Sequence, residues 1–169
     1  MIWEKKGLIY NVKGNYSWNK SHAQLPIVDV NYHRKWRIYY ATRNIKGQSN
    51  LSYIEVKPGS PSEILYEHDE PLLELGKVGT FDESGIMPVA IIDYNSKKYL
   101  YYAGWSLRKT TPYHNTIGLA ISTDNGTTFQ KYGKGSVLGE SQLEPYSTGT
   151  MNIIIEKDIW KGWYQSVTH

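Results

Sequence analysis

The sequence contains no cysteine, only two phenylalanines and no apolar run of membrane-spanning length. Without cysteine, the chain can form no disulfide, no thiolate metal site and no cysteine nucleophile. A transmembrane helix needs about 18 or more consecutive apolar residues. The charged N-terminal residues are not followed by the apolar core of a secretory signal. We therefore predict a cytoplasmic protein with no membrane partner.

Clustered positive charge is also lacking. The net charge is only +3, and the lysines and arginines are scattered along the chain, whereas a nucleic-acid surface needs a basic patch or stripe. The five histidines show no metal-ligand spacing. There is no phosphate-binding glycine loop and no serine-nucleophile elbow. The sequence predicts no nucleic-acid partner, no metal and no cofactor.

Tyrosine and tryptophan are abundant, with 15 and 6 residues respectively. Aromatic residues favour strands over helices. The 15 glycines and 7 prolines lie mostly between the apolar runs, where turns are needed. This pattern predicts an all-β fold.

Three aromatic segments recur at a spacing of 62 residues: 36–40, 98–102 and 160–164. Fourteen residues before the last tyrosine of each segment lie Pro26, Pro88 and Thr150, each of which opens an apolar run. Self-similarity at a fixed period indicates a repeat architecture. An apolar strand, a polar turn and an aromatic strand form the inner hairpin of a β-propeller blade. We therefore predict a β-propeller.

The second repeat predicts strands over residues 88–92, 99–103, 116–122 and 129–132. Between its last two strands, residues 122–129 fit the pattern Ser-x-Asp-x-Gly-x-Thr-aromatic, the Asp-box of sialidases and related propellers. Asp124 can accept backbone N–H bonds across this turn, Gly126 can take a positive φ, and Phe129 can bury between blades. We interpret the motif as a structural clasp and not as a catalytic site.

The first repeat predicts strands over 26–30, 36–41, 51–56 and 63–66, and the third over 150–155 and 160–164. Residues 3–10 are expected to form a lone outer strand.

The predicted organisation is a single partial propeller over residues 1–169, with about 2.5 blades of a five-bladed ring. Its expected parts are an outer strand and linker (1–19), blade 1 (20–81), blade 2 (82–143) and the start of blade 3 (144–169). An open arc exposes edges and faces, so we expect self-association or pairing with missing C-terminal blades.

Residues 22–26, 79–88, 101–105 and 117–122 carry a resemblance to five-bladed propeller glycosidases. The chain resembles arabinanase-like or β-fructosidase-like proteins near glycoside hydrolase families 43, 32 and 130. The resemblance implies a carbohydrate substrate that enters the central channel at one rim. It also implies that acidic residues at the entrances of the inner strands perform the hydrolysis.

Because the two inner strands of a blade are antiparallel, the start of the first and the end of the second share a rim. Asp82 lies six residues before Pro88, and Glu144 six before Thr150. By resemblance, Glu144 is the general acid, and Asp82 is the transition-state stabiliser or pKa modulator. The first blade has Lys20 at this position, which leaves three options open: hydrolysis with another acid, phosphorolysis, or no reaction.

Five further residues are candidates for substrate binding at the same rim: His22, Gln24, Arg43, Glu83 and Trp105. A guanidinium suits carboxylate or hydroxyl recognition, and an indole suits stacking on a sugar face. Each candidate also has an ordinary structural explanation as a turn cap, a solvated acid, an ion-pair partner or a packing aromatic. The alternative function is a carbohydrate-binding or interaction propeller without catalysis. A sialidase is a weaker option, because it would need an arginine triad and only Arg43 is expected at this rim.

Overall fold

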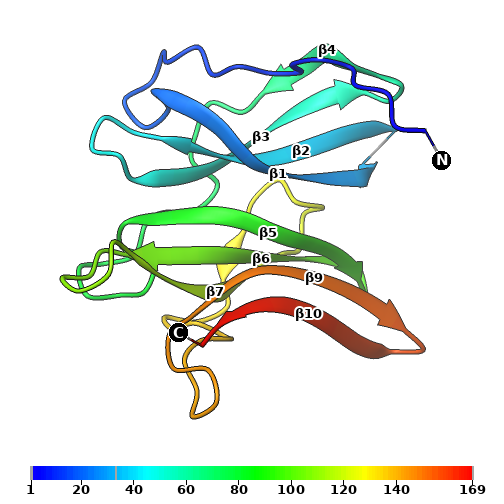
Figure 1. Ribbon diagram of the computed structural model, residues 1–169. Helices are drawn as coiled ribbons and strands as arrows, with labels where there is room; N and C mark the ends of the chain where they lie inside the picture. Colours follow the sequence, from blue (N-terminus) through cyan, green and yellow to red (C-terminus); the bar gives the residue numbers. More distant parts are fainter. Residues whose placement is uncertain (1, 33, 169) are drawn as a thin grey trace.

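The computed structural model describes residues 2–32 and 34–168, and none of these residues form a helix (Figure 1). The all-β class predicted from the composition is confirmed. The described part of the chain accordingly has no helix of the length and apolarity needed to cross a bilayer. Its strands are β1 Ser21–Tyr32, β2 Lys35–Arg43, β3 Ser49–Lys57, β4 Ser60–Glu67, β5 Gly85–Tyr94, β6 Lys97–Ser106, β7 His114–Ser122, β8 Gln130–Lys131, β9 Ser147–Glu156 and β10 Ile159–Val167.

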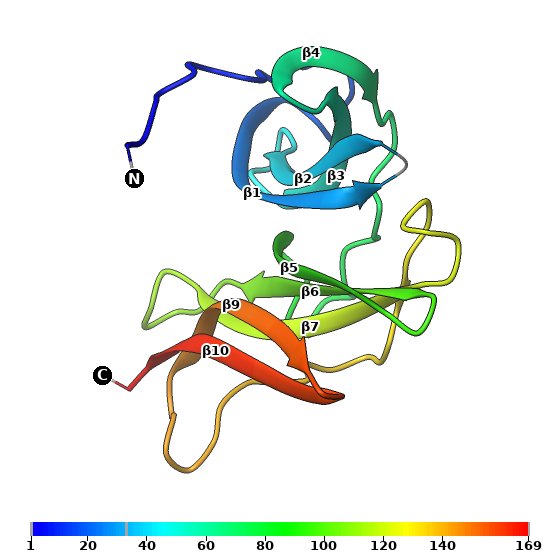
Figure 2. The ribbon, with the colours of Figure 1, turned by 90° about the vertical axis from the view of Figure 1, so that its right-hand side faces the viewer.

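The strands form three units, which we call sheet I (β1–β4), sheet II (β5–β8) and hairpin III (β9–β10). Within each unit, consecutive strands pair antiparallel. A parallel bridge between Ser49 and Gly85 joins sheets I and II. Sheet II lies between sheet I and hairpin III in both orientations (Figures 1 and 2). The arrangement is a stack of twisted antiparallel sheets.

The repeat predicted from the sequence is visible in the strand register. Ile91 pairs with Leu100 in sheet II, and Ile153 pairs with Gly162 in hairpin III, at 62 residues further along in both strands. The β1–β2 hairpin has three register irregularities instead. Extra residues bend a strand and redirect its side chains, so β1 differs from its counterparts in the region that reaches the rim.

The expected outer strand over residues 3–10 is wrong, because residues 2–15 form no strand. Trp3 is 89% exposed. Tyr10 and Val12 pack against the apolar cluster on the outer face of sheet I, which contains Ile38 and Tyr40. The segment is therefore held by side-chain packing on a sheet face and not by hydrogen bonds along a sheet edge.

The main core lies between sheets I and II. Because side chains alternate along a strand, Tyr39 faces this core while its neighbour Tyr40 faces the opposite side of sheet I. Phe129 packs edge-on against Tyr39 with ring centroids 6.0 Å apart. Such aromatic contacts fix the spacing of the two sheets. The buried members of the core are Tyr39, Leu51, Tyr53, Leu72, Leu73, Ile86, Leu100, Tyr102, Ala120 and Phe129.

A buried ion pair crosses the same interface. Lys98 Nζ lies 2.6 Å from Asp29 Oδ2, and each side chain is only 2% exposed. Lys98 Nζ also lies 2.6 Å from Oδ1 of the more exposed Asp93. Burying a charge is costly unless an opposite charge compensates it, so this contact specifies how sheet I faces sheet II.

A second polar contact joins sheet I to the turn between β7 and β8. Arg37 is 1% exposed and donates from Nη1 to the Gly126 carbonyl at 2.5 Å. Its Nη2 donates to Glu55 Oε1 at 2.8 Å. Burial opposes ionisation of Glu55, but hydrogen bonds from Lys35 and Arg37 outweigh it and lower the pKa of Glu55. Gly126 has φ +82°, a conformation that glycine adopts without strain.

The turn itself is organised around Asp124. Its Oδ1 accepts the Thr127 N–H at 3.1 Å and the Thr128 N–H at 2.9 Å, and it also accepts the Ser122 hydroxyl at 2.7 Å. Partial burial opposes ionisation, but these bonds prevail and lower the pKa of Asp124 to about 2. The carboxylate therefore acts as a local clasp for the β7–β8 connection.

Candidate functional site

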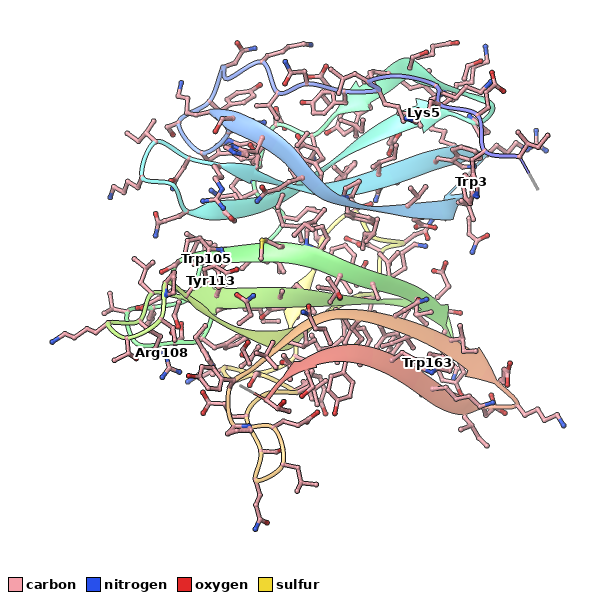
Figure 3. All side chains as sticks on the ribbon, in the orientation of Figure 1. Trp3, Lys5, Trp105, Arg108, Tyr113 and Trp163 are labelled. Atoms are coloured by element: carbon pink, nitrogen blue, oxygen red, sulfur yellow. The ribbon has the colours of Figure 1, made fainter. Side chains whose placement is uncertain are left out.

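A cavity of about 560 Å³ opens where β1 and β5 begin and where β2 and β6 end. Trp105 and Tyr113 lie next to each other at this end of the molecule (Figure 3). Three of the predicted substrate-binding residues, Gln24, Arg43 and Trp105, line this cavity. The full lining is Gln24, Leu25, Arg43, Met87, Trp105, Leu107, Pro112, Tyr113 and Asn115.

The indole of Trp105 is held in place by its N–H edge. Nε1 donates to the Ser49 hydroxyl at 3.2 Å, and Ser49 is fully buried. Gly85 packs directly beneath, where an added Cβ would lie 2.0 Å from Trp105 Nε1. The close approach of the indole to this backbone requires glycine, which explains why a glycine begins β5. Trp105 is thus a rigid part of the cavity wall.

Arg43 is the only residue in the described lining that carries a formal charge. Its Nη1 donates to the Gly47 carbonyl at 3.1 Å, and its Cζ lies 5.8 Å from the centroid of the Trp105 ring. Nε is buried and has no hydrogen-bond partner among the described residues. No described carboxylate lies within ion-pairing distance of Arg43, whereas Arg37 and Arg108 each pair with a glutamate. The guanidinium is therefore partly buried without a counter-charge from the described chain.

The irregular part of β1 brings Gln24 to the cavity and leaves His22 outside its lining. His22 and Leu25 have φ of 66° and 52°, which is sparsely populated for residues other than glycine. Gln24 Nε2 lies 4.0 Å from Met87 Sδ, while His22 is exposed and contacts the Ser21 hydroxyl through Nδ1 at 2.8 Å. Strained backbone of this kind costs about 1–3 kcal/mol per residue and often marks a functional site.

Asp82 lies elsewhere. Its carboxylate is 3% exposed, accepts from Lys131 Nζ at 2.5 Å and accepts the Tyr102 hydroxyl at 3.3 Å. Burial, and then the charge of Asp82, raise the pKa of Tyr102. Asp82 and Lys131 line a separate cavity of about 660 Å³. The neighbouring Glu83 accepts the Gly79 N–H at 2.6 Å, so it caps a turn.

Glu144 occupies the corresponding place in hairpin III. Its Oε1 and Oε2 accept the Tyr164 hydroxyl at 2.9 and 3.0 Å, and this bond raises the pKa of Tyr164. Both the tyrosines and the carboxylates of the Tyr102–Asp82 and Tyr164–Glu144 contacts are 62 residues apart. The structure therefore places the two acids in equivalent tyrosine contacts, but it does not bring either of them to the cavity of Arg43 and Trp105.

Sequence reasoning missed Tyr113 and Asn115, which complete the cavity wall. They follow a Thr-Pro loop that connects β6 to β7, and this connection lies on the same rim as Trp105. That topology could have identified them. Within the described residues, no three histidine, aspartate or glutamate side chains are placed to hold a metal ion.

No protein-family model matches the chain. Two uncharacterised proteins of Mycobacterium tuberculosis, Rv1502 and MT1551, are each 32% identical to it over 166 residues. The match covers 98% of this chain and 55% of each relative. The chain thus spans about half the length of the curated relatives it matches.

Solved structures show the same fold. A complex of BT0996 and RGII matches with a TM-score of 0.63 and 14% identity, over 94% of this protein and 52% of the solved one. A glycoside hydrolase matches with a TM-score of 0.60 and 14% identity, over 90% of this protein and 53% of the solved one. The chain therefore has a glycoside hydrolase-like fold.

Proposed function

We propose that this chain binds a carbohydrate in the cavity lined by Gln24, Arg43 and Trp105. The observation that carries the proposal is an indole fixed at the cavity wall beside a guanidinium and two side-chain amides. Aromatic faces bind the apolar faces of sugars, and fixed donors and acceptors select among their hydroxyls. The glycoside hydrolase-like fold supports a carbohydrate as the ligand.

Binding fits this cavity better than hydrolysis within it. Hydrolysis of a glycosidic bond ordinarily requires two carboxyl groups that flank the bond. Every described lining residue is apolar, aromatic, an amide or the single arginine. We therefore assign recognition of the sugar to this cavity.

The test is a binding panel of L-arabinose, D-fructose, D-galactose and D-galacturonate, measured by isothermal titration calorimetry. Trp105→Ala should weaken binding of the preferred sugar at least about tenfold, equivalent to about 1.4 kcal/mol. Trp163→Ala is the matched control, because Trp163 is 59% exposed on β10 toward the opposite end of the molecule (Figure 3). Equal losses in the two variants, or no binding of any sugar, would refute the proposal.

A second candidate is glycoside hydrolysis, with Glu144 as general acid and Asp82 as stabiliser. The repeated tyrosine–carboxylate contact favours it, because two acids occupy equivalent places in adjacent units. Glu144→Gln should then reduce turnover of an alkyl glycoside by about 10²–10⁴. It should spare nitrophenyl glycosides, whose leaving groups need little protonation, whereas Asp82→Asn should slow both. Equal losses on both substrates in Glu144→Gln would make Glu144 a binding residue.

We also propose that hairpin III is completed by further strands that pair with β10. Sheets I and II have four strands each, whereas hairpin III has two, and Ile159 and Trp163 on β10 are about 60% exposed. The relatives are longer than this chain. Sedimentation of the chain at micromolar concentration should show self-association. A compact stable monomer would contradict the proposal.

A further inference from the structure

We propose that the cavity of Arg43 and Trp105 selects a sugar that carries a carboxylate, such as a uronic acid. This inference rests on the proposed carbohydrate binding and specifies the class of sugar. Its basis is the charge of the cavity and not its shape. The described lining contains a guanidinium and no group of opposite charge.

The first step is the electrostatic state of Arg43. A partly buried cation that has lost water is stabilised when an anion or strong acceptors replace that water. Among the described residues, Arg43 has only the Gly47 carbonyl on Nη1, and Nε has no acceptor. A bound anion is the group that would complete its set of acceptors.

The second step is the form of the anion. A guanidinium presents parallel N–H groups that match the two oxygens of a carboxylate. The Trp105 ring lies 5.8 Å from Arg43 Cζ, so one ligand can contact both side chains. A sugar ring on the indole with a carboxylate attached to it satisfies the two groups together. Gln24 and Asn115 remain to bind its hydroxyls.

The third step concerns Gln24 and the residues around it. A neutral sugar would be best served by a wall of mixed donors and acceptors, including carboxylates. Instead, the described wall is completed by apolar side chains of Leu25, Met87 and Leu107. An apolar surround strengthens the attraction between a guanidinium and an anion, because it lowers the local dielectric. The cavity is therefore better suited to one anionic group than to a fully neutral ligand.

The experiment compares methyl α-D-galacturonoside with its methyl ester, which has the same sugar ring but no charge. Calorimetric titration of the purified protein should show the acid binding about 10- to 100-fold more tightly, the usual range for a hydrogen bond to a charged group. Arg43→Met should abolish that preference and leave the affinity for the ester within about threefold. D-Galactose 6-phosphate is included to identify a general preference for anions.

Arg108→Met is the matched control, because Arg108 is exposed and pairs with Glu140 outside the cavity. It should leave the preference for the acid unchanged. Far-ultraviolet circular dichroism and thermal unfolding check that each variant is folded, and Arg43→Lys provides a milder change if Arg43→Met does not fold. Lysine should retain part of the preference, since it keeps the charge but loses the bidentate geometry.

The outcomes separate the two proposals. Equal binding of acid and ester, both lost in Trp105→Ala, would overturn the acidic-sugar inference and leave carbohydrate binding intact. Tighter binding of the phosphate than of the carboxylate would overturn the choice of carboxylate. No binding of any of the three compounds would overturn both proposals at this cavity.

Discussion

The ion pair between Lys98 and Asp29 offers the sharpest test of how the two sheets are held together. Lys98→Met removes the charge and keeps most of the apolar side chain. The attraction at 2.6 Å is about 6 kcal/mol at an effective dielectric constant of about 20, and desolvation offsets part of it. The variant leaves Asp29 charged and 2% exposed with no cation, so we expect the free energy of unfolding to fall by about 3–5 kcal/mol.

The double variant Asp29→Asn/Lys98→Met removes both charges and keeps the acceptor for the Asn31 N–H, which Asp29 Oδ1 binds at 3.0 Å. It should therefore be more stable than Lys98→Met alone. Lys161→Met is the control, because Lys161 pairs with Glu156 at an exposed site and should cost less than about 1 kcal/mol. Urea unfolding followed by circular dichroism measures all three. A loss below about 1 kcal/mol in Lys98→Met, or a double variant as unstable as the sum of its single changes, would refute the reasoning.

Two further predictions concern the β7–β8 turn and the cavity wall. Asp124→Ala should lower the free energy of unfolding by roughly 1–3 kcal/mol, because the turn N–H groups lose their acceptor; the lower end applies because Asp124 is exposed and screened by water. The pKa of Asp124 falls from 3.8 to about 2 on folding, so its contribution is complete above pH 4 and is lost as the pH falls toward 2; urea midpoints of wild type and variant should converge there. Gly85→Ala should displace Trp105 and weaken sugar binding in calorimetry, whereas Gly135→Ala, where an added Cβ meets nothing within 4 Å, should not.

The repeat made the strands and their antiparallel order predictable, since side-chain alternation and turn residues are local signals. Their ends were not predictable. The strand expected over residues 26–30 extends from Ser21 to Tyr32, because strand ends depend on backbone hydrogen bonds to the neighbouring strand and not on apolar side chains. Residues 3–10 failed as a strand for a related reason. Their sequence resembles an outer strand, but nothing in it specifies an edge to pair with.

The site divides in the same way. Arg43 and Trp105 end adjacent strands of antiparallel hairpins, so their shared rim follows from topology alone. Asp82 belongs to the loop before β5, and spacing along the sequence does not reveal the direction of a loop side chain. Its partner Lys131 lies 49 residues away, and no local pattern announces that pair. Asp29 likewise pairs with a lysine in the next sheet.

The bond from Arg37 to the Gly126 carbonyl joins residues 89 positions apart, and it has a consequence for biosynthesis. Sheet I is complete at Glu67 and can be assembled on the ribosome before the β7–β8 turn is translated. The turn then meets an arginine that is already in place. Newly made sheet I thereby serves as a template on which sheet II closes, and the order of translation supports the order of assembly.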